Sequence, residues 1–119
     1  MESNLTKIVK SHYASSNIKL VDYKNLSPNV HETAYLADGV VIAGDVTIQE
    51  HANIWFNSVI RGDVAKVTIG RNTNIQDGTV IHTSRFDGPT HFGSNTTIGH
   101  MPLIHACRIE DNSFIGMQS

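Results

Sequence analysis

Residues 30–60, VHETAYLADGVVIAGDVTIQEHANIWFNSVI, decide the fold, because an aliphatic residue recurs there at every sixth position. A period of six fits neither the 3.6-residue turn of an α-helix nor the two-residue alternation of a single strand. Repeats of this length are typical of parallel β-helices, in which each hexad supplies one short strand and one turn. We therefore predict an all-β solenoid of triangular cross-section, with three hexads in each coil.

The repeat continues beyond residue 60, with a phase slip, an insertion and a deletion. If the nine-residue step from Ile60 to Ile69 contains a three-residue loop, the aliphatic anchors fall on three sides. Side one carries Val30, Ile48, Ile69, Phe92 and Ile109; side two carries Leu36, Ile54, Ile75, Ile98 and Ile115; side three carries Ile42, Ile60, Ile81 and Ile104. We expect the anchors to point inward and to stack at the strand spacing of ~4.8 Å.

The fourth residue after each anchor is usually small or β-branched, as at Ala34, Ser58, Val64 and Thr73, which suits a corner without room for bulk. Residues 1–26 lack the hexad signal. Leu5, Ile8 and Val9 within them fit either a cap over the open end of the solenoid or a disordered segment. We expect residues 27–119 to form the β-helix domain, incomplete at its C-terminus because the chain stops in mid-hexad.

The composition excludes several functional classes. A net charge of -2 and a pI near 6.3 leave no basic surface for nucleic acid. No stretch approaches the ~20 apolar residues of a membrane span, and the N-terminus lacks the apolar core of a signal peptide. The single cysteine, Cys107, excludes an intrachain disulfide and fits a reducing, cytoplasmic compartment. No activating base is placed for Cys107, so we expect it to be structural or incidental.

Two of the seven histidines share one position of the repeat. His82 follows Ile81 and His105 follows Ile104, so both belong to side three in successive coils and face outward. One coil spacing suits two imidazoles on one metal ion. His100 belongs to side two, so only a neighbouring copy could easily bring it to the same ion. Two stacked surface histidines also arise by chance in a chain with this many.

Other polar residues surround the interruptions of the repeat. Arg61 and Asp63 flank the phase slip; they could equally form a surface salt bridge of little energetic value. Asn74, Gln76 and Asp77 surround the Ile75 anchor, where a polar ladder or a turn is the plainer interpretation. The insertion from Thr83 to His91 reads as a turn that could also line a site.

Three segments, NIWFNSVIRGDV (53–64), TNIQDGTVIHTS (73–84) and TIGHMPLIHACRIEDNSFIGM (97–117), resemble the γ-class carbonic anhydrase family, and the resemblance spans residues 26–118. It implies a left-handed β-helix that assembles as a homotrimer. It also implies a metal ion, zinc or else iron or cobalt, bound by His82 and His105 of one subunit and His100 of the next. The implied chemistry is reversible hydration of CO2 to bicarbonate by a metal-bound hydroxide.

The resemblance also assigns roles beside the metal. Gln76 resembles a residue that hydrogen-bonds near the metal-bound water. Arg61 and Asp63 resemble a pair that ties subunits together, and Asn74 and Asp77 resemble polar supports of the site. Two departures stand out: Val64 and Arg85 occupy places where prototype enzymes carry acidic proton shuttles, and the family's further coils and C-terminal helix are absent.

Two other functions compete with this one. A hexapeptide-repeat acyltransferase would use one histidine as a general base and an acyl-carrier groove, but one histidine would then suffice. A catalytically silent trimeric scaffold would retain the metal for stability, and the lack of acidic shuttle residues favours this alternative over an active enzyme.

Overall fold

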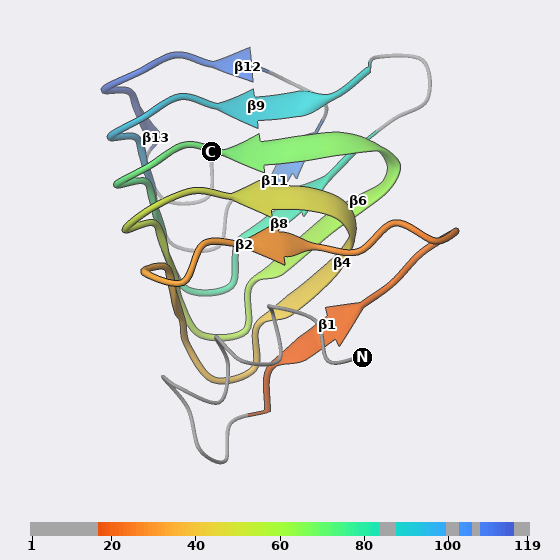
Figure 1. Cartoon of the computed structure of the whole chain (residues 1–119). Coiled ribbons are helices and arrows are strands. Elements are labelled where there is room, and N and C mark those ends of the chain that lie inside the picture. Colours follow the sequence, from red (N-terminus) through yellow and green to blue (C-terminus); the bar gives the residue numbers. More distant parts are fainter. Residues whose placement is uncertain (1–16, 84–87, 100–102, 106–107, 116–119) are drawn as a thin grey trace.

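The computed structural model describes residues 17–83, 88–99, 103–105 and 108–115, and these form a column of short strands wound into coils (Figure 1). The strands are β1 Lys19–Val21, β2 Asn29–Val30, β3 Tyr35–Leu36, β4 Val41–Ile48, β5 Asn53–Ile54, β6 Val59–Ile69, β7 Asn74–Ile75, β8 Val80–His82, β9 Thr90–Phe92, β10 Thr97–Ile98, β11 Leu103–His105, β12 Arg108–Ile109 and β13 Phe114–Ile115. Within these ranges no helix is present that could cross a membrane.

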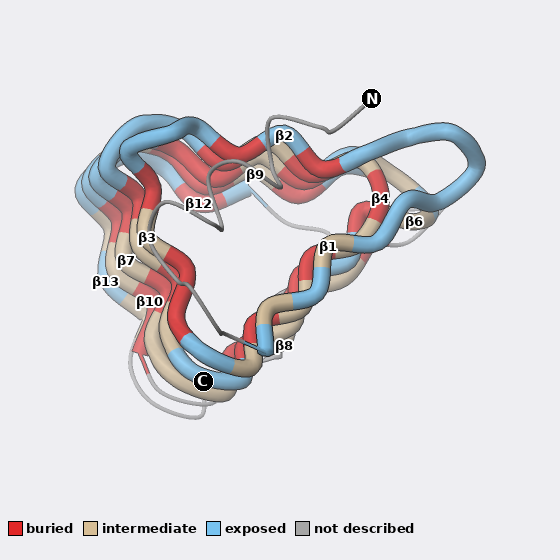
Figure 2. Tube along the Cα trace, turned by 60° about the horizontal axis from the view of Figure 1, so that its bottom comes forward, coloured by how far each residue is buried: buried red, intermediate tan, exposed pale blue. Residues whose placement is uncertain are grey.

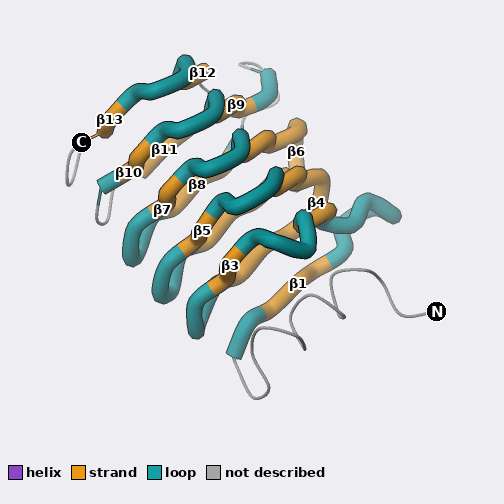
Figure 3. The backbone as a smooth tube through the Cα atoms, turned by 60° about the vertical axis from the view of Figure 1, so that its left-hand side comes forward, coloured by secondary structure: helices purple, strands orange, loops and turns teal. Residues whose placement is uncertain are grey.

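All pairings between named strands are parallel, and they make two sheets (Figure 3). The five-stranded sheet runs in the order β13-β10-β7-β5-β3 and forms side two. The eight-stranded sheet runs β1-β4-β6-β8-β11 on side three and continues through β2, β9 and β12 on side one. Strands β4 and β6 are long enough to turn the corner between these two sides. The fold is therefore the predicted parallel β-helix.

The solenoid is left-handed, as the family resemblance implied. Figure 2 looks along it with the N-terminal coil nearest the reader, and the chain passes from β1 through β2 and β3 to β4 counter-clockwise as it recedes. The cross-section in this view is triangular, with the buried positions on the inner side of each strand.

The register confirms the predicted assignment of anchors to sides. On side three, Ile42 pairs with Ile60, Ile60 with Ile81, and Ile81 with Ile104. The anchors of sides one and two pair in the same way, each with its predicted partner. Every anchor from Val30 to Ile98 is no more than 2% exposed. Because burying one such side chain stabilises the fold by ~1.5–3 kcal/mol, these columns are the core.

The corners follow the predicted rule with one exception. Ala34, Ser58 and Thr73 are fully buried corner residues. Val64 is wrong as a corner residue, because it is 50% exposed in the three-residue insertion, and Val67 takes the corner by pairing with Val46. The coil also begins earlier than the hexads indicate. Strand β1 pairs with β4 through Leu20 and Ile42, although residues 1–16 lie outside the described ranges.

Candidate metal site

All the long insertions of the solenoid leave it at one corner, between sides three and one. Residues 22–28 join β1 to β2 there, and residues 83–89 join β8 to β9. Within β6, Gly62 pairs with Gly44 and Val67 with Val46, so the residues between Gly62 and Val67 form the third insertion. In solenoids, insertions on one face commonly build the binding site. This corner is therefore the first place to look for one.

The outward row of side three beside this corner carries the candidate ligands. Ala43 pairs with Arg61, and His82 pairs with His105, while Ile60 and Ile81 join the two halves in register. The predicted placement of His82 and His105 in one position of successive coils is thus confirmed by the backbone. The His82 side chain is half-buried. Histidines in this backbone register are positions from which imidazole ligands for zinc, iron or cobalt can come.

Arg61 and Asp63 form an ion pair at the foot of this row. Arg61 donates from Nε at 3.1 Å and from Nη2 at 2.6 Å, both to Oδ2 of Asp63. Burial raises the pKa of the Asp63 carboxyl, but the hydrogen bonds and charge of Arg61, together with the backbone N–H groups of Asp63 and Val64, outweigh it and hold the pKa below its ordinary value of 3.8. The other oxygen, Oδ1, is buried and has no partner among the described residues. The carboxylate therefore remains charged and presents one unused acceptor.

Thr83 was missed by sequence reasoning, yet it ties two of the insertions together. Its hydroxyl oxygen accepts a hydrogen bond from the backbone N–H of Ala65 at 3.0 Å, and Thr83 itself is only 5% exposed. This bond links the insertion in β6 to the residue that directly follows His82. The only sequence feature that points to Thr83 is its position directly after the Ile-His pair. The residue type alone does not indicate which group its hydroxyl contacts.

Asn74 and Gln76 lie on another side of the prism. They flank the buried Ile75 in β7, on side two, and are separated from His82 by the turn at 77–79. Oδ1 of Asn74 is buried without a partner among the described residues, whereas the backbone oxygen of Gln76 accepts from Ser58 Oγ at 2.9 Å and from Thr79 Oγ1 at 2.8 Å. The predicted site residues of one chain therefore lie on two different faces of the prism.

His100 lies outside the described residues, and of His105 the structure describes the backbone alone. Across the described part of the chain, no three or more of the side chains His, Cys, Asp and Glu gather to hold a metal ion. The pair in register on side three and the polar residues on side two therefore lie on different faces of the described chain.

Known proteins resemble the chain over most of its length, although no family model matches it. It is 48% identical over 90 residues to the probable carbonic anhydrase of Methanocaldococcus jannaschii, covering 76% of this chain and 56% of that protein. It is 37% identical over 110 residues to the mitochondrial gamma carbonic anhydrase 2 of Arabidopsis thaliana, covering 88% and 40%. A crystal structure of a hexapeptide transferase family protein from Anaplasma phagocytophilum matches with a TM-score of 0.75 and 39% identity, covering 84% and 69%.

The chain belongs to the γ-carbonic-anhydrase-like family of hexapeptide-repeat proteins. Membership agrees with the fold, the hexad register and the segments around Arg61, His82 and His105. The chain spans about half the length of the curated carbonic anhydrases it matches.

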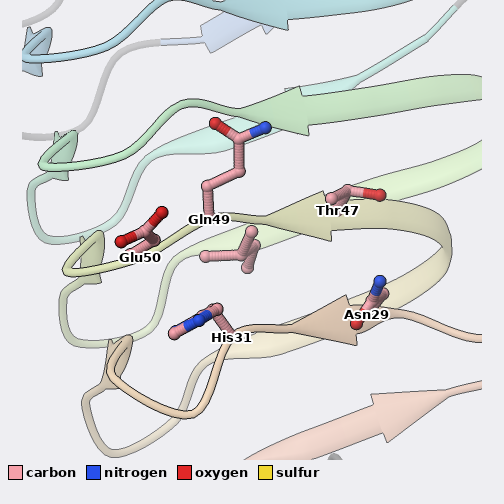
Figure 4. Close-up of a pocket in the computed structure, with 6 residues that line it drawn as sticks. Asn29, His31, Thr47, Gln49 and Glu50 are labelled. Carbon is pink, nitrogen blue, oxygen red and sulfur yellow. The ribbon is translucent and has the colours of Figure 1, made fainter.

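A second hollow, on side one, is separate from the pair formed by His82 and His105. Residues Asn29, His31, Thr47, Ile48, Gln49 and Glu50 line it (Figure 4). The side chain of His31 hydrogen-bonds within its own turn: Nδ1 lies 2.9 Å from Thr33 Oγ1 and 3.1 Å from the Thr33 backbone nitrogen. None of the proposed metal ligands or site residues lines this hollow.

Proposed function

We propose that this protein catalyses the reversible hydration of CO2 to bicarbonate at a metal site shared between adjacent subunits of a homotrimer. The observation that carries the proposal is the register of His82 with His105, which sets two potential ligands in adjacent coils. Relatives named carbonic anhydrase match 76% and 88% of this chain at 48% and 37% identity. The activity is a proposal for this chain because it covers only part of those relatives.

His82 and His105 of one subunit and His100 of the next would hold zinc, or iron or cobalt. Such an ion, when bound by three imidazoles, acts as a Lewis acid and lowers the pKa of water toward ~7. The chain's own residues complete the site. The side-chain amide of Gln76, half-exposed on side two, can donate a hydrogen bond to a reacting oxygen, and Asn74 Oδ1 offers a buried acceptor beside it.

Arg61 and Asp63 would position the subunits rather than react. Arg61 lies next to His82 in the outward row, and its ion pair with Asp63 fixes the guanidinium at the edge where a neighbouring chain would approach. The ion pair of Arg61 with Asp63 would therefore act only where two chains meet.

The test combines metal analysis with a CO2 hydration assay on anaerobically purified protein. We expect close to one metal ion per chain, and loss of both metal and activity in His82→Ala. His31→Ala is the matched control, since His31 lies on side one and hydrogen-bonds locally. Wild-type protein without bound metal, or equal losses in both variants, would contradict the proposal.

A silent scaffold is the second candidate, and one observation favours it. Val64 is half exposed at the insertion beside the site and cannot carry a proton. A metal-loaded trimer without hydration activity would identify this function. An acyltransferase, in keeping with the name of the similar hexapeptide transferase family protein, would instead transfer an acyl group from its carrier without tight metal.

A further inference from the structure

The corner between sides two and three carries a strip of residues, each two positions after a side-two anchor. The strip consists of Asp38, Phe56 and Asp77. Successive turns are joined by hydrogen bonds from Asn57 N to Asp38 O at 3.2 Å and from Gly78 N to Phe56 O at 2.9 Å. The three residues therefore occupy one position of consecutive coils, with the aromatic residue between two aspartates, of which Asp38 accepts a hydrogen bond from the Asn17 N–H through Oδ1 at 2.9 Å.

Phe56 is an exposed ring on a braced support. It is 44% exposed, and its ring lies 5.9 Å from that of Trp55 at an angle of 58°. Trp55 in turn lies 5.1 Å from the ring of Tyr35 and donates from Nε1 to Asn53 Oδ1 at 2.8 Å. An exposed aromatic residue held in this way loses little conformational entropy on binding, which is typical of interface anchors.

Side three offers the complementary surface. Its outward rows place Val41 beside Val59 and Ala43 beside Arg61. These small apolar side chains leave room for a ring. Arg61 uses only Nε and Nη2 on Asp63, so its remaining N–H groups can meet carboxylates that flank the ring. The strip and side three therefore match in both apolar character and charge.

The heights along the solenoid also match. Residue 56 falls in the chain between Ala43 and Arg61, which are neighbours in adjacent coils of side three. Because the chain rises continuously, Phe56 lies at a height between these two residues. Rotation about an axis parallel to the solenoid preserves height, as in any cyclic assembly with that axis. Phe56 of one copy thus meets the step between Ala43 and Arg61 of another.

We propose that Phe56 anchors a second copy of this chain by seating its ring on side three between Ala43 and Arg61. This inference rests on the proposed shared metal site, which brings the same corner against the same side. The corner strip then forms a second contact below the metal, with Asp38 and Asp77 beside Arg61. Assembly would accordingly persist, weakened, when the metal is removed.

The test is a disulfide cross-link between differently tagged chains in a Cys107→Ser background. One chain carries Phe56→Cys and the other Ala43→Cys, and the two are refolded together and mildly oxidised. We expect a disulfide-linked pair containing both tags. The control replaces Ala43→Cys with Thr47→Cys, whose outward position lies on side one. No mixed-tag pair, or equal yield with the control, would overturn the inference.

A second measurement separates this inference from the proposed function. Phe56→Asp should shift the metal-free protein to monomers, while Leu26→Asp, at a similarly exposed apolar residue in the segment that joins β1 to β2, should not. If Phe56→Asp stays as associated as wild type and metal binding is normal, the anchor is wrong and the shared site stands. If wild-type protein is monomeric and binds no metal, the proposed function fails and this inference fails with it.

Discussion

The hydroxyl of Thr83 and the backbone N–H of Ala65 meet at 3.0 Å, and their hydrogen bond joins the insertions of two successive coils. Both insertions stand beside His82, so this bond holds the surroundings of the candidate metal site. We predict that Thr83→Val lowers the free energy of unfolding by about 1 kcal/mol, because the partly buried N–H of Ala65 loses its acceptor. Urea denaturation measures the change. Thr83→Ser retains the hydroxyl and should lose much less; equal losses in the two variants would contradict this role.

Thr90 presents the opposite case. Its hydroxyl is buried at the corner between sides three and one, beside Val67, without a hydrogen-bond partner in the described residues. Thr90→Val keeps the shape and removes the unpaired polar group, so we predict a gain in stability of about 1 kcal/mol. Thermal unfolding provides the measurement. A variant less stable than wild type would show that the hydroxyl has a partner.

The corner between sides one and two uses left-handed backbone in four successive coils, beginning with the turn between β4 and β5. His51, Asn72, Asn95 and Asn112 all have φ between 56° and 62°. At Asn95 we predict that Val costs about 1–2 kcal/mol of unfolding free energy, because a β-branched residue is strained in this region. Asn95→Gly, which has no such strain, should change it by only a few tenths. Similar costs for Val and Gly would contradict the assignment of strain.

The pKa of Asp63 predicts how stability depends on pH. Arg61 holds this pKa below 3.8 despite burial, so the folded state favours the charged carboxylate. The stabilisation is present above pH 3.8 and is lost as the pH falls through the lowered pKa. Unfolding free energies of wild type and Asp63→Asn should therefore converge in strong acid and separate as the pH rises. Parallel curves over this range would show that Asp63 is not the group responsible.

Much of the fold was predictable from the sequence, because a buried side of a β-helix tolerates only aliphatic residues at a fixed spacing. Ile60 and Ile81 could therefore be assigned to one column across a nine-residue step and two further hexads. Leu20 could not be assigned in this way, because it lies ten positions before Val30 and so breaks the period of six. In the structure it pairs with Ile42. The position of Leu20 in the coil follows from the backbone pairing of β1 with β4 and not from the hexad repeat.

The candidate site was less predictable, for physical reasons. The register of His82 with His105 followed from the anchors beside them. The bond between Thr83 and Ala65 did not, because it depends on the path of an insertion that no repeat constrains. The separation of Gln76 from His82 onto different faces followed from the assignment of sides, whereas the proposed contact between those faces depends on a second chain that the repeat does not describe.

The central claim, a metal site built from two chains, is tested most directly by complementation. The His82→Ala, His105→Ala double variant and the His100→Ala variant should each bind no metal at these sites. Refolded together with different tags and purified through both, every mixed trimer contains one interface where intact halves meet, so we predict about one third of the wild-type metal content. Mixed trimers that recover no metal would contradict the shared site.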